Sequence, residues 1–360
     1  QTAAHASMLR YAPVTKCYVF SYIGAVLKLY RFRPLSNFLF KELNYQELYC
    51  AMSSELNDPQ DLSARVNFYA DTESELCGLA QFIMLQSIIC DSSMSHVMEY
   101  LDVVSDNRLK NHIENIYKNS DEKFIGLDKF IHIIADFYQL GGIPNVSVNL
   151  LISRVKGVIS SVLNNSSISC FTESVDNYLM WSHYASAHRG ICIEFDCNKN
   201  DNETAILPIV YRNEKTGALY ESAADIHKVK YNDTLPSISF SELLYVFSNI
   251  DDVDVKYLSK ARYHVFAQEL VEYFTNKTAS WSSENEWRHI NVSFNNLYQE
   301  DRIFRYDIKS VSGIYFGAKT SVNDKLRIKN IFERLHYEPR YYKSVVNGSS
   351  GIYFENESFD

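Results

Sequence analysis

The hydrophobic pattern of this chain changes twice along its length, and that change constrains the fold more than any other feature. Between about 26 and 60, short alternating runs rich in β-branched and aromatic residues indicate strands around a short helix. From 72 to 164, apolar residues recur at helical spacing, as Leu76, Leu79 and Ile83 illustrate. Short strands then return, with helices between them. The chain therefore combines a strand-rich part with a helical part.

This order predicts an α+β fold, because irregularly spaced strands interrupted by helices do not suit a doubly wound parallel sheet. Counting from Met8, residues 8–71 are expected to form the first part of a mixed-sheet core. Residues 72–164 are expected to form an all-α insertion or subdomain, and 165–360 the rest of the core. A chain of 360 residues, 46% of them hydrophobic, can bury such a core without disulfides.

The later elements can be placed from local pattern. Short apolar or alternating runs predict strands and longer 3.6-residue patterns predict helices. Strands are expected near 26–32, 168–171, 190–195, 206–211, 286–293, 302–308 and 311–316, and helices near 176–186, 254–276 and 322–335.

Charge narrows the classes of partner. A formal net charge of -9 argues against nucleic-acid binding over the whole surface, because phosphate needs a field of opposite sign. A local basic groove is still open to the chain. Its candidates, if they line one rim, are Arg31, Arg33, Arg189, Lys309 and Lys319.

Cysteine use and hydropathy predict a cytoplasmic location without membrane contact. The seven cysteines form no C-x-x-C motif, which favours buried free thiols in a reducing compartment. The most apolar early stretch, Cys17 to Leu27, has about half of the roughly 20 residues that a bilayer span needs.

Several common catalytic motifs are absent. The chain has no G-x-G-x-x-G, no G-x-x-x-x-G-K-[ST], no H-E-x-x-H and no G-x-S-x-G. Its only close histidine pair is His183 and His188, five residues apart, without a nearby Cys or carboxylate at ligand spacing. We therefore predict no metal site and no Rossmann-type or P-loop nucleotide site.

Two segments place aromatic and basic residues together. In 29–33, Tyr30 and Phe32 share one strand face and Arg31 takes the other, beside a cleft or in water. In 170–195, Trp181 and Tyr184 lie three residues apart on one helix face. This pair either lines an aromatic pocket or anchors the helix to the sheet.

A third segment, 281–288, brings two carboxylates and a guanidinium together. On a strand, Glu284, Glu286 and Arg288 would share one face. They form either an ion-pair ladder or a site in which Arg288 holds one carboxylate while the other faces a ligand. The earlier Asn57-Asp58-Pro59 is typical of a turn with side-chain-to-backbone bonds, and we interpret it as punctuation.

These segments together resemble a bacterial family that is known only as a domain of unknown function. The matching motifs occur in order from about 27 to 320, and none lies in 72–164. They are Leu29-Tyr30-Arg31-Phe32, Asn57-Asp58-Pro59, Cys170-Phe171-Thr172-Glu173, Leu179 to Tyr184, Gly190 to Phe195, Trp281 with Glu284 to Arg288, and Ile314 to Lys319.

The motif order also resembles, more distantly, the ADP-ribosyltransferase fold. Those enzymes place a polar residue on a first strand, an aromatic residue on a strand-plus-helix unit and a Glu on a late strand. The resemblance implies Arg31, Tyr184 and Glu286 as the catalytic set. It implies that NAD is held by Arg31, Phe171, Thr172, Trp181 and Tyr184. By residue type, Trp281 or Trp181 could serve as the aromatic residue and Glu284 as the acid.

This resemblance implies an NAD-dependent ADP-ribosyltransferase, a toxin-like or phage-defence effector of the bacterial cytoplasm. NAD would be the substrate, a protein or nucleic acid the acceptor, and a cognate antitoxin or regulatory protein the partner. A carboxylate near the ribose would stabilise the positive charge that develops as nicotinamide leaves, most strongly in a water-poor cleft.

Two other functions are compatible with the residues. One is a non-enzymatic sensor or interaction protein that keeps the fold and binds a partner through 72–164. The other is a metal-dependent nuclease or hydrolase using Glu173, Asp176, Glu194 and Glu286, although these carboxylates are scattered over several elements.

Overall fold

The computed structural model describes residues 25–58, 60–62, 65–68, 125–132, 166–212, 219–239, 270–292, 297–347 and 351–359, with isolated positions between 111 and 157. The predicted helical insertion at 72–164 lies almost entirely outside these residues. Within it, 127–132 are helical, and the buried Phe130 stacks on Phe68 with ring centroids 5.5 Å apart. Most of the predicted helix at 254–276 also lies outside, although 270–274 are helical.

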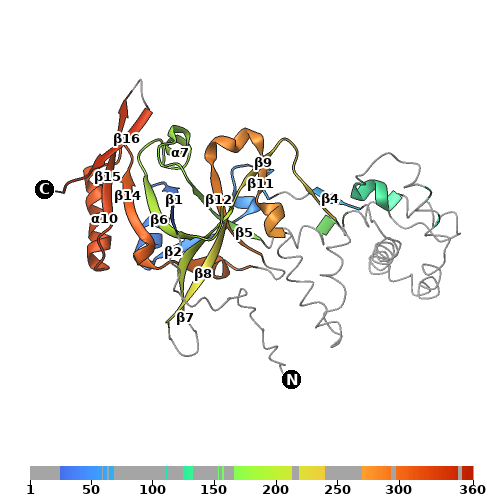
Figure 1. Ribbon diagram of the computed structural model, residues 1–360, viewed down its shortest axis with the longest axis horizontal. Coiled ribbons are helices and arrows are strands. Elements are labelled where there is room, and N and C mark those ends of the chain that lie inside the picture. Colours follow the sequence, from blue (N-terminus) through green and yellow to red (C-terminus); the bar gives the residue numbers. More distant parts are fainter. Residues whose placement is uncertain are drawn as a thin grey trace, which may run out of the picture.

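Six antiparallel strands form a barrel-like sheet at the centre of the molecule (Figure 1). In spatial order they are β1 (Val26–Arg33), β5 (Ser167–Thr172), β12 (Glu286–Asn291), β8 (Leu219–Lys228), β7 (Thr204–Arg212) and β6 (Ile191–Lys199), and β6 pairs back onto β1.

The closure of this sheet is uneven around β1. Eight register pairs join β1 to β6, whereas a single pair in the described chain, Tyr30 with Thr172, joins β1 to β5. Thr172 is the last residue of β5, so the two strands pair only at this end of β5. This split between β1 and β5 has fewer register pairs than any other described junction of the barrel.

Three further strands extend the sheet beyond β6, in orange to red at the left of Figure 1. β14 (Val311–Phe316) pairs antiparallel with β6, β15 (Arg340–Asn347) pairs parallel with β14, and β16 (Gly351–Asn356) pairs antiparallel with β15. The parallel pair makes the sheet mixed. Together with the few helices that the structure describes, this confirms the predicted α+β class.

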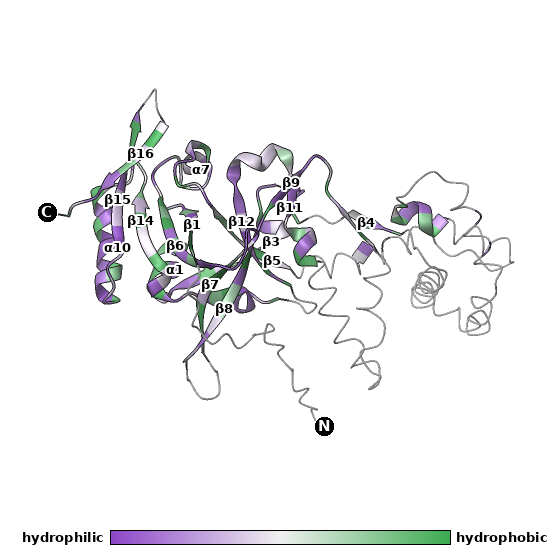
Figure 2. Cartoon of the chain, viewed as in Figure 1, coloured by the Kyte–Doolittle hydropathy of each residue, from purple (hydrophilic) through white to green (hydrophobic). Residues whose placement is uncertain are grey.

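Helix α10 (Val322–Arg334) connects β14 to β15 and covers one face of the extension. The hydroxyl of Ser321 caps its first turn by accepting from the backbone N–H of Asp324. Ile328, Ile331 and Phe332 are buried, and much of the rest of the helix is hydrophilic (Figure 2). The helix is thus amphipathic, as its sequence period predicts.

Short elements complete the described chain. They are α1 (Asn37–Tyr45), β2 (Glu47–Tyr49), β3 (Ala51–Met52), η1 (Ser53–Glu55), β4 (Arg65–Asn67), α7 (Tyr178–His183), β9 (Lys230–Asn232), β10 (Ser237–Ser239), β11 (Asn276–Thr278), η3 (Ala279–Glu284), η4 (Glu300–Arg302), β13 (Ile303–Arg305) and η5 (Ile308–Ser310). No helix among the described residues has the length and apolar character needed to cross a membrane.

Successive side chains of β1 face opposite sides of the sheet, as predicted. Leu29 joins the main core, and Arg31 is buried on the same side. Tyr30 and Phe32 face the opposite side, where Phe32 meets the indole of Trp181 edge-on at 5.0 Å. The side of β1 that packs into the barrel therefore buries the guanidinium of Arg31 among apolar residues.

The helix before Tyr184 ends earlier than predicted. α7 stops at His183, and a tight turn follows in which Ser186, Ala187 and His188 all have positive φ. Gly190 ends that turn, where a Cβ would lie 2.2 Å from the carbonyl oxygen of Arg33. A close backbone crossing that only glycine permits thus fixes where α7 sits against β1.

Candidate functional site

A cavity of about 200 Å³ opens at the split between β1 and β5. Four of the six residues predicted for the site line it, namely Arg31, Phe171, Tyr184 and Glu286. The alternative candidates Trp281 and Glu284 line it too. The resemblance therefore selected residues from three separate parts of the sequence that the fold brings to one place.

The other two predicted site residues lie beside the cavity and not on its wall. The hydroxyl of Thr172 is buried and donates to the backbone carbonyl of Glu284 at 2.6 Å. The indole of Trp181 is fully buried under α7 and donates to the carbonyl of Val175 at 2.7 Å. The sequence left two interpretations of the Trp181 and Tyr184 pair, and each holds for one residue. Trp181 anchors the helix, and Tyr184 lines the cavity.

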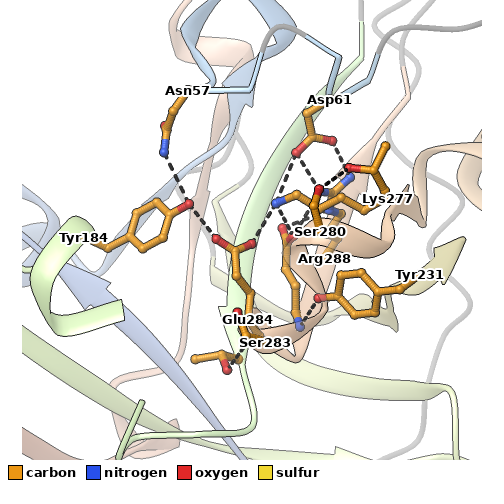
Figure 3. A network of polar contacts seen from close by, with 12 residues as sticks. Asn57, Asp61, Tyr184, Tyr231, Lys277, Ser280, Ser283, Glu284 and Arg288 are labelled. Atoms are coloured by element: carbon orange, nitrogen blue, oxygen red, sulfur yellow. Dashed lines mark hydrogen bonds and ion pairs between the residues drawn. The ribbon is translucent and has the colours of Figure 1, made fainter. Parts of the chain in front are cut away.

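One wall of the cavity belongs to a buried group of charged residues, which we call the ion cluster: Asp61, Lys277, Glu284, Glu286 and Arg288. The first four line the cavity, and Arg288 lies behind them. Arg288 lies at the centre of the cluster, with no exposed surface. Its Nε is 2.8 Å from Oε1 of Glu286. Its Nη2 is 2.7 Å from Oδ2 of Asp61 (Figure 3). Arg288 therefore holds two carboxylates at once.

Lys277 joins the two glutamates. Its Nζ lies 2.7 Å from Oε2 of Glu284 and 3.0 Å from Oε2 of Glu286. The ring of Trp281 lies against the same ammonium, 4.9 Å from it, so this indole acts as a cation–π partner of Lys277.

The electrostatics of the ion cluster keep Glu286 ionised. Burial by itself would raise the pKa of Glu286, but Arg288 and Lys277 lower it to about 2. Burial likewise opposes the charge on Lys277, yet the neighbouring carboxylates, Glu286 foremost, raise its pKa. Three carboxylates against two cations give the cluster a formal charge of -1.

Glu284 does not lie on a strand, contrary to the sequence prediction. It ends η3, and Asn285 follows with a φ of 45°, which turns the chain into β12. Its carboxylate still faces the same cluster as Glu286 because Lys277 bridges the two. The sequence thus predicted the shared location and not the backbone that produces it.

Tyr184 connects the ion cluster to the opposite side of the cavity. Its hydroxyl donates to Oε1 of Glu284 at 2.8 Å and accepts from Nδ2 of Asn57 at 3.2 Å (Figure 3). Burial and the charge of Glu284 both raise the pKa of this phenol. Tyr184 is therefore a neutral hydrogen-bond donor.

A second charged group lies on the β1 side. Arg31 is 6% exposed and donates to the carboxylate of Glu42, the hydroxyl of Ser169 and two backbone carbonyls. Arg33 shares Glu42, with its Nη2 2.8 Å from Oε2. Two cations against one carboxylate give this end of the cavity a formal charge of +1.

Only part of the proposed basic rim reaches the cavity. Arg31 and Arg33 line it, whereas Arg189, Lys309 and Lys319 are not among the residues on its wall. The structure therefore joins two of these five basic residues at the candidate site.

The carboxylates considered for a metal site have separate partners. Glu173 accepts from Lys228 and from the indole of Trp287, and Glu194 accepts from Lys28. Within the described ranges, no three His, Cys, Asp or Glu side chains are grouped so that they could hold a metal ion. The nuclease hypothesis gains no ligand set from this part of the chain.

Sequence reasoning missed two members of the ion cluster. Asp61 comes from the loop after Asn57-Asp58-Pro59, and Lys277 from β11. Neither has a pattern that points to the site. Their one signal is proximity in sequence to segments already singled out, since Asp61 follows Asp58 by three residues and Lys277 precedes Glu284 by seven.

Comparison with known proteins gives one match. A family model described as "Protein of unknown function (DUF2971)" matches residues 180–289. The matched segment includes Trp181, Tyr184, Glu284 and Glu286. No curated protein and no solved structure matches the chain. The match supports the predicted resemblance to a family of unknown function.

Proposed function

We propose that this protein is an NAD-dependent ADP-ribosyltransferase whose reaction takes place at the split between β1 and β5. One observation carries the proposal. The carboxylate of Glu286, with a pKa lowered to about 2, lines a cavity that also contains Glu284 and the neutral phenol of Tyr184. The matching family model names no activity.

The reaction needs such a carboxylate. The bond between C1′ of the ribose and the nicotinamide nitrogen breaks, and the electron pair leaves with nicotinamide. The acceptor then bonds to C1′ and gives up a proton. Positive charge develops on the ribose between these events, and a fixed anion in a cavity of low dielectric stabilises it. Glu286 is our candidate for that anion, with Glu284 beside it.

The opposite charges at the two ends of the cavity suit NAD. Its pyridinium ring is positive and its pyrophosphate is negative. The ion cluster at -1 would face the ring and ribose, and the Arg31, Arg33 and Glu42 group at +1 would face the pyrophosphate. Phe171 and Tyr184 supply aromatic surface for the nicotinamide.

The cavity is small for the whole dinucleotide. Sites that enclose drug-sized ligands have volumes of about 300–1,000 Å³, against about 200 Å³ here. We therefore propose that it encloses the nicotinamide end of NAD and that the adenosine end lies outside. In this proposal the acceptor is a protein or a nucleic acid, as in a toxin-like or phage-defence effector.

The test is incubation of the pure protein with NAD labelled in its ADP-ribose part. Nicotinamide release and label transfer are measured with and without cellular RNA, DNA and lysate. Glu286→Gln is expected to abolish both while the protein stays folded. Glu357→Gln is the matched control, since Glu357 pairs with Lys325 at 2.7 Å and does not line the cavity. An active Glu286→Gln protein would remove Glu286 from the role.

A second candidate function is a non-catalytic sensor on the same fold. The observation that favours it is that both oxygens of Glu286 already accept from Arg288 and Lys277. A carboxylate used only to hold the fold would have this arrangement. Failure of the unsubstituted protein to consume NAD in every mixture above would favour the sensor.

A further inference from the structure

Asp61 follows the turn at Asn57 and Asp58, and its side chain makes contacts that the turn does not need. The turn itself is confirmed, because Oδ1 of Asp58 accepts from the backbone N–H of Gln60 at 2.9 Å. The loop then places Asp61 inside the ion cluster, where it is 7% exposed. A charged residue this deeply buried has to be compensated by an opposite charge.

Asp61 and Glu286 hold Arg288 from two sides. Oδ1 and Oδ2 of Asp61 lie 2.8 and 2.7 Å from Nη1 and Nη2 of Arg288. Nε and Nη2 of Arg288 lie 2.8 and 3.0 Å from Oε1 and Oε2 of Glu286. The guanidinium is planar, so bidentate contacts on two of its edges fix its plane and the plane of each carboxylate.

The backbone next to Asp61 is also held. Leu62 has a φ of 56°, which is unusual for a bulky residue, and its N–H donates to Oδ1 of Asp61 at 3.0 Å. Oδ1 is therefore fixed by Arg288 and by its own backbone. The loop presents this carboxylate in one orientation.

We propose that Asp61 is a positioning residue that acts through Arg288 to hold the carboxylate of Glu286 for the reaction. Asp61 makes the two-edged contact to Arg288 complete. Without it, among the described residues, Nη1 of Arg288 keeps only the backbone carbonyl of Phe274, at 2.8 Å, and Nη2 keeps only Glu286, so the guanidinium plane is held less tightly against Glu286. This inference rests on the proposed function for its kinetic consequence. Its structural consequence can be measured separately.

The first experiment measures the contact directly. In NMR spectra of the 15N-labelled protein, the Nε–H of Arg288 reports on the bond to Glu286, because Asp61 contacts only the Nη atoms. Its resonance is assigned by its loss in Arg288→Lys. In Asp61→Asn we expect its exchange with solvent to become about tenfold faster, the scale for one lost hydrogen bond. The backbone amides of β12 serve as the reference and should keep their protection.

The second experiment measures NAD turnover. Asp61→Asn is expected to lower kcat by up to about 100-fold, the scale for misplacing a reacting group by about 1 Å. The KM for NAD should stay the same, because Asp61 acts on the carboxylate that stabilises the transition state. Glu357→Gln should change neither the Nε–H exchange nor kcat.

Each outcome decides between the proposals. Unchanged Nε–H exchange in Asp61→Asn overturns the positioning role, whatever the kinetics show. Faster exchange in a protein that never consumes NAD upholds the positioning role and rejects the proposed function. A rise in KM at constant kcat also overturns the inference, since it indicates a binding role. Should Asp61→Asn fail to fold, Asp61→Glu keeps the charge but displaces Arg288, and the same shifts are expected.

Discussion

Two groups of charged residues lie on the same face of the sheet and differ in one respect. The register sets Glu194 opposite Tyr30, Tyr30 opposite Thr172, and Thr172 opposite Glu286. Glu286 belongs to the ion cluster. Glu194 belongs to a second group, the Glu194 cluster, made of Lys28, Glu194, Asp196, Ser312, Tyr315 and Arg340.

The two clusters differ in the exposure of their cations. Glu194 is as buried as Glu286, but Lys28 and Arg340 have side chains that are 40% and 61% exposed. The cations of the ion cluster, Lys277 and Arg288, are 6% and 0% exposed. Solvent already reaches the cations that pair with Glu194, whereas those that pair with Glu286 are buried. A buried glutamate therefore depends on its cation only when that cation is buried as well.

The largest effect is expected from removing the central cation. Arg288→Met keeps much of the side-chain volume but leaves Asp61 and Glu286 without their shared partner. Breaking a buried ion pair on one side costs about 3–5 kcal/mol. Urea denaturation should show that loss in the free energy of unfolding. A loss below about 1 kcal/mol, the range of exposed pairs, would erase the difference between the clusters.

The next largest effect is expected in the free energy of unfolding at acidic pH. Because the folded-state pKa of Glu286 is about 2, below its ordinary 4.5, its contribution is fully present above pH 4.5 and is lost as the pH falls toward 2. The shift corresponds to about 3 kcal/mol. Glu286→Gln should flatten the decline of unfolding free energy between pH 4.5 and 2.

Glu194 gives the comparison for that experiment. Burial opposes its charge, but bonds from Lys28, Ser312 and Tyr315 lower its pKa. Its contribution also disappears below pH 4.5, with the same sign. Because its cations are exposed, Glu194→Gln should flatten that decline less than Glu286→Gln does. Equal flattening would show that cation burial has no influence.

The tyrosine hydroxyls that donate to the two clusters should contribute equally to the free energy of unfolding. Tyr184 donates to Glu284 at 2.8 Å, and Tyr315 donates to Glu194 at 2.7 Å. A hydrogen bond to a charged acceptor contributes about 1.5–3 kcal/mol. We expect Tyr184→Phe and Tyr315→Phe each to lower the free energy of unfolding by about 2 kcal/mol. A large difference between the two losses would show that the clusters differ in more than the exposure of their cations.

The smallest effect is expected at the exposed cation of the Glu194 cluster. Arg340→Met should cost less than about 1 kcal/mol, as exposed ion pairs do. The loss should vanish in roughly 1 M salt, where the screening length falls to about 3 Å. Thermal unfolding at low and high salt measures it. A loss of stability that persists at high salt would show that Arg340 contributes as a buried cation does.

Local patterning predicted most of the strands near the site. β14 occupies 311–316 as expected, α10 is one residue shorter than the predicted 322–335, and β12 begins at the predicted Glu286. These elements follow from side-chain alternation and helical period, which depend on neighbours in sequence. α7 differs because the left-handed turn after it depends on a crossing with β1, which no local pattern contains.

The candidate site was predicted in part. Arg31, Phe171, Tyr184 and Glu286 line one cavity, and their choice came from the order of motifs along the chain. Arg288 pairs with Glu286, as both interpretations of 284–288 require, so the contact does not choose between them. The other partner of Arg288, Asp61, lies more than 220 residues earlier, at a sequence separation of 227. Pairing at that distance depends on the closed sheet.

The sequence by itself determined which face each strand residue takes, because alternation is a property of the extended backbone: Arg31 lies opposite Tyr30, and Glu286 lies with Arg288. The tertiary structure alone decided which cation meets which carboxylate and how deeply each is buried. Lys277 and Tyr184 reach Glu284 from β11 and from the end of α7, and Asp61 reaches Arg288 from the loop before β4. They meet at the split, where the described chain has one register pair between β1 and β5. Burial then sets the strength of each pair, since charges interact strongly only where water is excluded.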